Sequence, residues 1–182
     1  MRKLASEILS FWFEELSPKQ HFVKDDAIDA AIKARFAAQI PRAAAGGFDD
    51  WQEDCKSALA LVILLDQFPR NAFRNTPQSF AYDCAALARA REMVRKQQDM
   101  ALQLDQRAFV YMPYMHAENL AAQEACIQLF SENCPRKDNI RFAIIHRDII
   151  RDHGRFPHRN EILGRISTKA ELAFLKSDGF KG

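Results

Sequence analysis

The segment DWQEDCKSALALVILLDQ, residues 50–67, contains the longest apolar run of this chain. From Ala58 to Leu65 every residue is apolar, so a helix over this segment has no polar face to turn toward water. Such a helix is stable only where other elements surround it. The apolar run is also far shorter than the roughly 20 residues that cross a bilayer. The sequence therefore predicts a helix over 50–67 at the centre of the core.

Amphipathic patterns on both sides of this stretch predict further helices. The expected helices cover residues 4–14, 26–39, 80–97, 104–111, 118–130 and 138–153, and a capping-box pattern at Ser167, Thr168 and Glu171 opens the last one. Pro69 and Pro113 are expected to end the helices before them, and Asp138 is expected to cap the helix that follows it. The pattern predicts an all-α fold of about seven or eight antiparallel helices without strands.

The composition is that of a helical globular protein. Of 182 residues only six are glycine and three are tyrosine, while 48% are hydrophobic and 27% are charged. Residues with a high helix propensity therefore outnumber those typical of sheets, and the composition is far from that of disordered chains. The length fits one domain, residues 1–182, which is large enough to bury a core without disulfides or a metal.

Charge and cysteine usage argue against several classes of function. The formal net charge is +2, so no overall field holds the protein on nucleic acid or an anionic membrane, and we expect neither partner. The cysteines form no CxxC pair, and Cys55, Cys84 and Cys126 lie in helical stretches where small buried thiols are common. No export signal is evident, so we expect a reduced, cytoplasmic protein. Motifs for nucleotides, serine hydrolases and zinc proteases are absent, and we expect no cofactor or metal.

The best candidate for a site is a turn rich in arginine. Residues 146–165 carry five arginines, three histidines and no lysine. Gly154 can adopt the left-handed cap conformation and Pro157 restricts the chain after it. The turn is therefore expected to present Arg155, His158, Arg159 and Asn160 as donors for a carboxylate or phosphate. The alternative is that these side chains pair with buried carboxylates or cap helix carbonyls.

A second segment repeats the theme of Phe-Pro followed by Arg-Asn. It places Asp66 at the expected end of the central helix, followed by Arg70 and Asn71. A negative charge near a helix C-terminus needs a cation close by, so we expect a buried pair of Asp66 with Arg70 or Arg159. Otherwise Asp66 could orient a histidine or an arginine within a pocket.

The third unusual segment is YMPYMHAEN at 111–119. One interpretation is an aromatic turn capped by its own polar residues. The other is a pocket wall, in which Tyr111 and Tyr114 offer stacking surface and His116 or Glu118 transfers protons.

His146 lies on the same helical stripe as Phe142. We expect it to be half-buried and hydrogen-bonded beside that ring. The alternative is an acid or base role, because histidine titrates near neutral pH.

Three segments together resemble the bacterial family called domain of unknown function 924. They are DQFPRN at 66–71, YMPYMHAEN at 111–119 and HGRFPHRNEILGR at 153–165. The resemblance implies an all-helical fold with a degenerate tetratricopeptide-like stack of helical hairpins, and it brings no established activity and no catalytic residue. The chain departs from the family pattern at Asn75, where glycine is usual, and at Ala117, where serine is usual. Asparagine tolerates the left-handed conformation, whereas Ala117 removes a hydroxyl group.

Three functional hypotheses follow. The first is binding of a small anionic ligand or an acidic peptide terminus at the Arg/His turn, with Arg70 and Asn71 opposite and Tyr111, Tyr114 and His116 closing the pocket. The second is a hydrolase or phosphoryl-transfer enzyme with His146 or His158 as general base and Asp66 or Glu118 orienting it. The third is a protein-interaction scaffold in which the arginines stabilise the fold.

Overall fold

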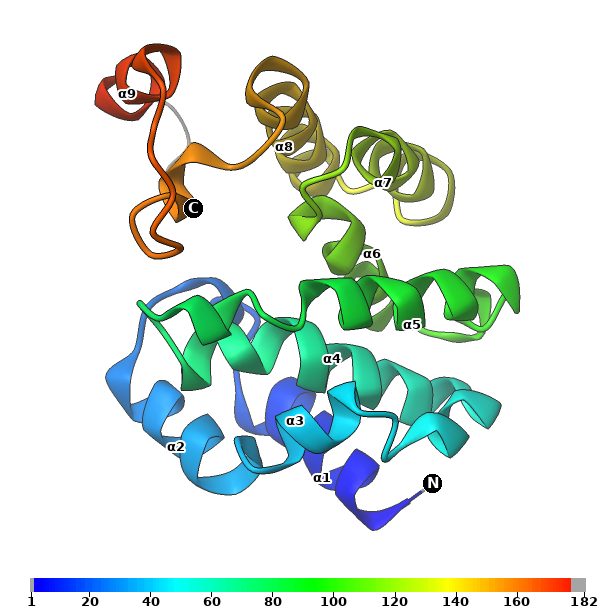
Figure 1. Ribbon diagram of the computed structural model, residues 1–182. Coiled ribbons are helices and arrows are strands. Elements are labelled where there is room, and N and C mark those ends of the chain that lie inside the picture. Colours follow the sequence, from blue (N-terminus) through cyan, green and yellow to red (C-terminus); the bar gives the residue numbers. More distant parts are fainter. Residues whose placement is uncertain (1, 178–182) are drawn as a thin grey trace.

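The chain folds into an all-α structure, seen here in a computed structural model that describes residues 2–177 (Figure 1). The α-helices are α1 (Lys3–Ser10), α2 (Asp26–Phe36), α3 (Gln39–Ala44), α4 (Cys55–Ala72), α5 (Asp83–Arg95), α6 (Leu104–His116), α7 (Leu120–Asn133), α8 (Lys137–His153) and α9 (Lys169–Lys176). Short 3-10 and π-helical turns connect them, and there is no strand between residues 2 and 177. The all-α prediction is confirmed, while both ends of the expected domain 1–182 lie outside the described residues.

Helix α4 occupies the centre of the fold, as its apolar run predicts. Every residue from Ser57 to Pro69 is buried. The helix packs against α1, α2 and α3 on one side and against α5 and α6 on the other. Figure 1 shows α7, α8 and α9 on the far side of α5 from α1, α2 and α3. Successive helices from α4 to α8 each pack against the next one, and a tetratricopeptide-like stack remains an expectation.

The ends of α4 differ from the prediction. The helix begins at Cys55, where the Asp54 side chain accepts a hydrogen bond from the Ser57 amide, and not at residue 50. It also continues through Pro69 to Ala72, so the expected stop at Phe68 is wrong. Proline inside a helix costs about 3 kcal/mol, and the burial of the whole segment offsets that cost. Asp66 therefore lies within the helix and not in its last turn.

Two other helix boundaries also need correction. Helix α6 continues through Pro113 to His116, although Pro113 was expected to interrupt it, because its residues from Ala108 to Met115 are all buried. Helix α8 begins at Lys137, and Asp138 lies in its first turn without capping it. An acidic side chain in the first turn still interacts favourably with the helix dipole.

The segment after α8 forms the remaining layer. Helix α8 ends at Gly154 in the expected left-handed conformation, with φ of 71°. A 3-10 turn, Pro157–Arg159, follows, and Thr168 with Glu171 forms the expected capping box of α9. Ile149, Ile150 and Phe156 form a small apolar cluster of their own beside the main core. The C-terminal layer thus has little apolar contact area of its own and depends on polar contacts as well.

The cysteines are free thiols, and two of the three that were expected to be buried are not. Cys126 is buried, but Cys55 is only partly buried and Cys84 is exposed near the start of α5. No helix within residues 2–177 combines the length and the apolar character that a bilayer span needs.

Candidate functional site

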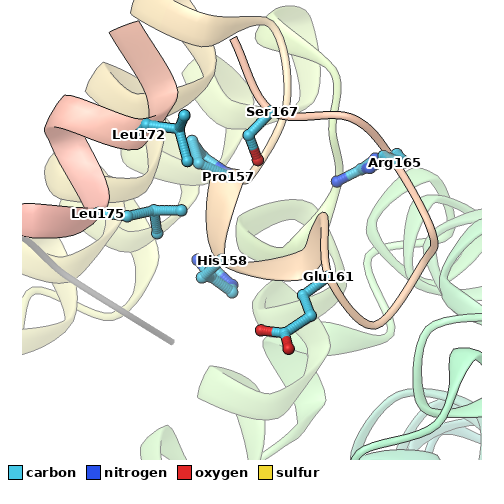
Figure 2. Close-up of a pocket in the computed structure, with 7 residues that line it drawn as sticks. All are labelled: Pro157, His158, Glu161, Arg165, Ser167, Leu172 and Leu175. Carbon is cyan, nitrogen blue, oxygen red and sulfur yellow. The ribbon is translucent and has the colours of Figure 1, made fainter. Parts of the chain in front are cut away.

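The turn after α8 borders a pocket of about 530 Å³ that faces α9 (Figure 2). Its polar lining consists of His158, Glu161, Arg165 and Ser167. Its apolar lining consists of Pro157 from the turn and Leu172 and Leu175 from α9. Of the four donors expected on this turn, only His158 lines the pocket.

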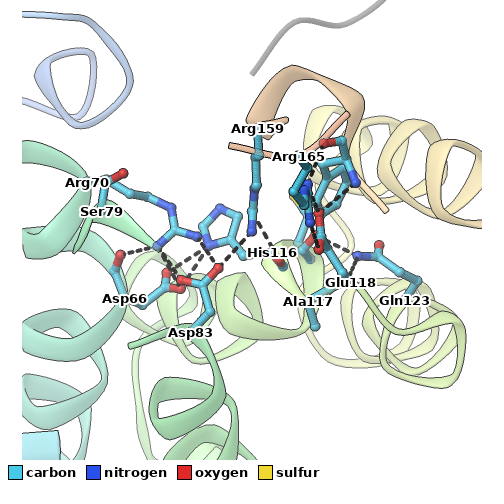
Figure 3. A network of polar contacts seen from close by, with 12 residues as sticks. Asp66, Arg70, Ser79, Asp83, His116, Ala117, Glu118, Gln123, Arg159 and Arg165 are labelled. Atoms are coloured by element: carbon cyan, nitrogen blue, oxygen red, sulfur yellow. Dashed lines mark hydrogen bonds and ion pairs between the residues drawn. The ribbon is translucent and has the colours of Figure 1, made fainter. Parts of the chain in front are cut away.

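A buried polar network joins parts of the fold that are far apart in the sequence (Figure 3). It comprises Asp66 and Arg70 of α4, Asp83 at the start of α5, His116 at the end of α6 and Arg159 of the turn after α8. Helix α4 contacts both α5 and α6, which brings the first four residues together. The network therefore assembles only in the folded chain.

Asp66 holds the imidazole ring of His116. The Nδ1 atom of His116 lies 2.9 and 3.0 Å from the two carboxylate oxygens of Asp66. The Asp66 side chain is fully buried, whereas that of His116 is 17% exposed. A carboxylate can only accept at Nδ1, so this geometry assigns the proton of the neutral ring to Nδ1 and leaves the lone pair on Nε2. Among the described residues, Nε2 has no hydrogen-bond partner.

The surroundings keep this histidine neutral. Burial and the positive charge of Arg70 lower the pKa of His116 below its ordinary 6.5, against the opposing effect of Asp66. Burial acts to raise the pKa of Asp66, but His116, Arg70 and the hydrogen bond from Gln67 outweigh it and lower the pKa to about 2. Near pH 7 the pair is therefore an ionised carboxylate and a neutral imidazole.

Asp83 is shared by two arginines. Arg70 lies 3.0 and 3.1 Å from its two oxygens, and Arg159 donates to Oδ2 at 2.9 Å. Arg159 also donates to the His116 carbonyl oxygen at 3.0 Å, and its guanidinium carbon lies 4.4 Å from the centre of the Phe80 ring. Two cations and two anions balance, so the network with a neutral His116 carries no net charge.

Arg159 retains one unused donor. Its side chain is 7% exposed, and its Nε atom is buried without a hydrogen-bond partner among the described residues. The Phe156 ring covers the guanidinium group at 4.6 Å. Every other polar group of this side chain is directed at Asp83 or His116.

The remaining arginines of the turn also have internal partners. Arg155 forms hydrogen bonds of 2.6 and 2.9 Å with Glu171. Arg165 forms hydrogen bonds of 2.6 and 2.9 Å with Glu118 and donates to Asn160 Oδ1 at 2.9 Å. The arginines of the turn therefore match the alternative in which they pair with the carboxylates of the protein.

Glu118 and Asn71 have structural partners as well. Glu118 Oε1 accepts from the Phe156 amide at 2.8 Å and so fixes the start of the turn, in addition to pairing with Arg165. Asn71 donates to Asp29 of α2 at 2.8 Å and does not face the turn. The expected Asp66 to Arg70 pair is present at 3.5 Å, whereas Arg159 binds Asp83 and not Asp66.

Tyr111 and Tyr114 belong to the core and do not form a pocket wall. Tyr111 is fully buried, and its hydroxyl donates to Asp99 Oδ2 at 2.6 Å. Tyr114 is 5% exposed, and burial raises its pKa to about 12. Helix α6 continues past Pro113, so both rings lie on a packed helix and not in an aromatic turn.

His146 is buried, at 7% exposure, and so lies deeper than the half-buried position expected for it. Its Nδ1 atom lies 2.8 Å from the Phe142 carbonyl oxygen. Burial lowers the pKa of His146 to about 3, and burial together with the charge of Arg159 lowers that of His158 to about 4. No group of three or more His, Cys, Asp or Glu side chains between residues 2 and 177 could hold a metal ion.

Sequence reasoning did not identify Asp83, although it anchors the network. It is 76 residues from Arg159, and no local spacing relates the two. Arg165 and Glu171 were visible only as part of the basic segment and the capping box. An acidic residue in the first turn of a helix is so common that it carries no signal for a site.

Comparisons with known proteins agree with this architecture. The family model described as "Bacterial protein of unknown function (DUF924)" matches residues 8–179. The chain is similar to a solved protein of unknown function from Agrobacterium tumefaciens, at 41% identity and a TM-score of 0.90. The match covers 95% of this chain and 97% of that one. A search of curated proteins found no match.

Proposed function

The chain belongs to the bacterial family DUF924, and we propose that it is an acid–base enzyme that acts on a small polar molecule with His116 as its base. The observation that carries this proposal is the contact of both Asp66 oxygens with Nδ1 of His116. A carboxylate in that position fixes the ring and its tautomer, which is the arrangement that a general base requires.

The chemistry follows from the two ring nitrogens. Nε2 of His116 takes a proton from a water molecule or a hydroxyl group as that group attacks the substrate. The imidazolium that forms keeps its Nδ1 hydrogen on Asp66, and the buried carboxylate stabilises the new positive charge. The proton then passes from Nε2 to the leaving group, which restores the neutral ring. Asp66 acts here as a positioning residue, since it does not touch the reacting atoms.

The two arginines support the same reaction. Burial and, after it, the charge of Arg70 lower the pKa of His116, which keeps the base neutral near pH 7. Arg159 presents a buried Nε donor without a partner. The Nη2 group of the same guanidinium donates to the His116 carbonyl oxygen, which holds this donor close to His116. A donor in a site that excludes water stabilises negative charge that develops on a substrate oxygen. Hydrolysis or phosphoryl transfer fits this arrangement.

Binding of a small anion or an acidic peptide terminus without turnover is the second candidate. The unpartnered Nε of Arg159 favours it. The carboxylates of Asp83, Glu118 and Glu171 neutralise the arginines, so we expect weaker anion binding than four free guanidinium groups would give. Titration with orthophosphate and acetate separates this candidate from catalysis, because it predicts binding with no product.

A panel of p-nitrophenyl esters, p-nitrophenyl phosphate and peptide amides tests the enzyme proposal. For any substrate that is turned over, His116→Gln should lower kcat/KM by about 100-fold or more, because general base catalysis contributes a factor of that size. Asp66→Asn should lower kcat more than it raises KM. His153→Gln, at the end of α8, is the matched control and should retain full activity. Equal activity of His116→Gln and wild type would remove His116 from the reaction.

A further inference from the structure

The pocket beside the turn is separate from the His116–Asp66 pair. Neither of those residues lines it, and its walls come from the segment 157–167 and from α9 (Figure 2). Its volume of about 530 Å³ lies within the range of small-molecule sites in proteins. A ligand bound there is held by the C-terminal layer alone.

One wall of the pocket is apolar. Leu172 and Leu175 lie three residues apart on α9 and therefore share one face of that helix, with Pro157 across from them. Leu172 is 47% exposed although it is a large hydrophobic residue. Covering such a side chain with the hydrocarbon part of a ligand removes apolar surface from water and is favourable.

The polar side chains of the pocket differ in whether they carry a charge that a ligand can use. Arg165 is neutralised by two hydrogen bonds to Glu118, and burial lowers the pKa of His158 to about 4, so His158 carries no charge near pH 7. Glu161 is different, because its carboxylate has no ion-pair or hydrogen-bond partner within residues 2–177. The charge that remains available to a ligand in this pocket is therefore negative.

We propose that this pocket binds a small primary amine in its ammonium form, with the ammonium group on Glu161 and a short hydrocarbon chain on Leu172, Leu175 and Pro157. Ser167, elsewhere in the lining, is uncharged and its hydroxyl oxygen accepts a hydrogen bond from Asn160 at 3.0 Å. A carboxylate ligand of the same length is disfavoured, because Glu161 repels it and the Arg165 fork is already occupied.

NMR titration of the wild-type protein with hexylammonium and with hexanoate tests this inference. Hexylammonium should cause saturable amide shifts around Glu161, Ser167 and Leu172, and hexanoate should not. Glu161→Gln should weaken hexylammonium binding about threefold, as expected for an exposed charge pair, and Leu172→Ala should also weaken it. Glu132→Gln, an exposed substitution on α7, is the matched control and should bind like wild type.

The inference is overturned if hexanoate binds as well as hexylammonium, if the shifts map elsewhere, or if Glu161→Gln binds hexylammonium unchanged. His116→Gln should bind hexylammonium as wild type does. This result separates the pocket from the proposed activity, because either one can fail without the other.

Discussion

Asp66 shows how one charge is accommodated inside a helix that is otherwise apolar. Its carboxylate is fully buried, and it accepts from His116 Nδ1 and from Gln67 Nε2 at 2.6 Å. A buried carboxylate without such partners would be protonated or would destabilise the fold. The same contacts that stabilise this charge also set the tautomer of His116, so structure and proposed chemistry depend on one residue.

Replacing that charge should destabilise the protein. Asp66→Asn keeps the size of the side chain but leaves Arg70 with one carboxylate fewer, and it gives His116 an uncharged amide that can donate as well as accept. Removing one partner of a buried ion pair costs about 3 kcal/mol, which urea unfolding followed by circular dichroism can measure. Asp152→Asn, in an exposed pair with Arg151, is the control and should leave the unfolding midpoint unchanged. A midpoint for Asp66→Asn equal to that of wild type would contradict the assigned network.

The turn 154–165 depends on Arg159 for its attachment to the other helices. This side chain binds Asp83 of α5 and the carbonyl of His116 in α6, and it lies between two phenylalanine rings. A lysine in its place keeps the positive charge, but its single ammonium group lacks the planar fork of donors that reaches Asp83 and the His116 carbonyl at the same time. The turn should then lose its attachment to the rest of the fold.

Hydrogen exchange of Arg159→Lys measures this attachment. Amides of residues 155–165 should exchange faster than in wild type, while those in the middle of α4 should stay protected, because α4 is held by its own apolar contacts. Arg141→Lys, an exposed substitution on α8, is the control and should change neither region. Unaltered exchange in the turn would show that Arg159 does not anchor it.

The same elements show what a sequence can predict. Caps such as Thr168 with Glu171, and the left-handed Gly154, depend on local chemistry and were predictable. The continuation of α4 through Pro69 and of α6 through Pro113 was not predictable. Packing against distant elements buries both segments, and this outweighs the preference of proline to end a helix. Likewise Asp66 stood out as a charge directly after an apolar run, whereas its histidine partner depends on tertiary packing. The distant pair of Asp83 and Arg159 left no local pattern.

Buried histidines couple the stability of the protein to pH. His146 has a pKa of about 3 in the folded protein against 6.5 when free, so the folded state excludes a proton that the unfolded chain binds. The stability that this residue contributes is fully present above pH 6.5 and declines as the pH falls toward 3. At pH 5 the proton uptake of His146 in the unfolded chain alone lowers the free energy of unfolding by about 2 kcal/mol.

Urea unfolding at several pH values tests this coupling. The free energy of unfolding of the wild type should fall between pH 7 and pH 5, before most carboxylates titrate. In His146→Gln the unfolded chain no longer binds a proton at position 146. The free energy of unfolding of this variant should therefore fall less between pH 7 and pH 5 than that of the wild type, whatever its value at pH 7. Parallel curves for the two proteins would contradict the assigned burial of His146.

¹⁵N NMR of the His116 ring measures directly whether Asp66 holds this histidine as a neutral base. At pH 7 the ring should be neutral, with hydrogen on Nδ1 and none on Nε2, and it should titrate below pH 6.5. In Asp66→Asn this preference for the Nδ1 hydrogen should weaken. A ring that carries hydrogen on Nε2 at pH 7, alone or together with Nδ1, would contradict the claim that Asp66 holds His116 ready as a base.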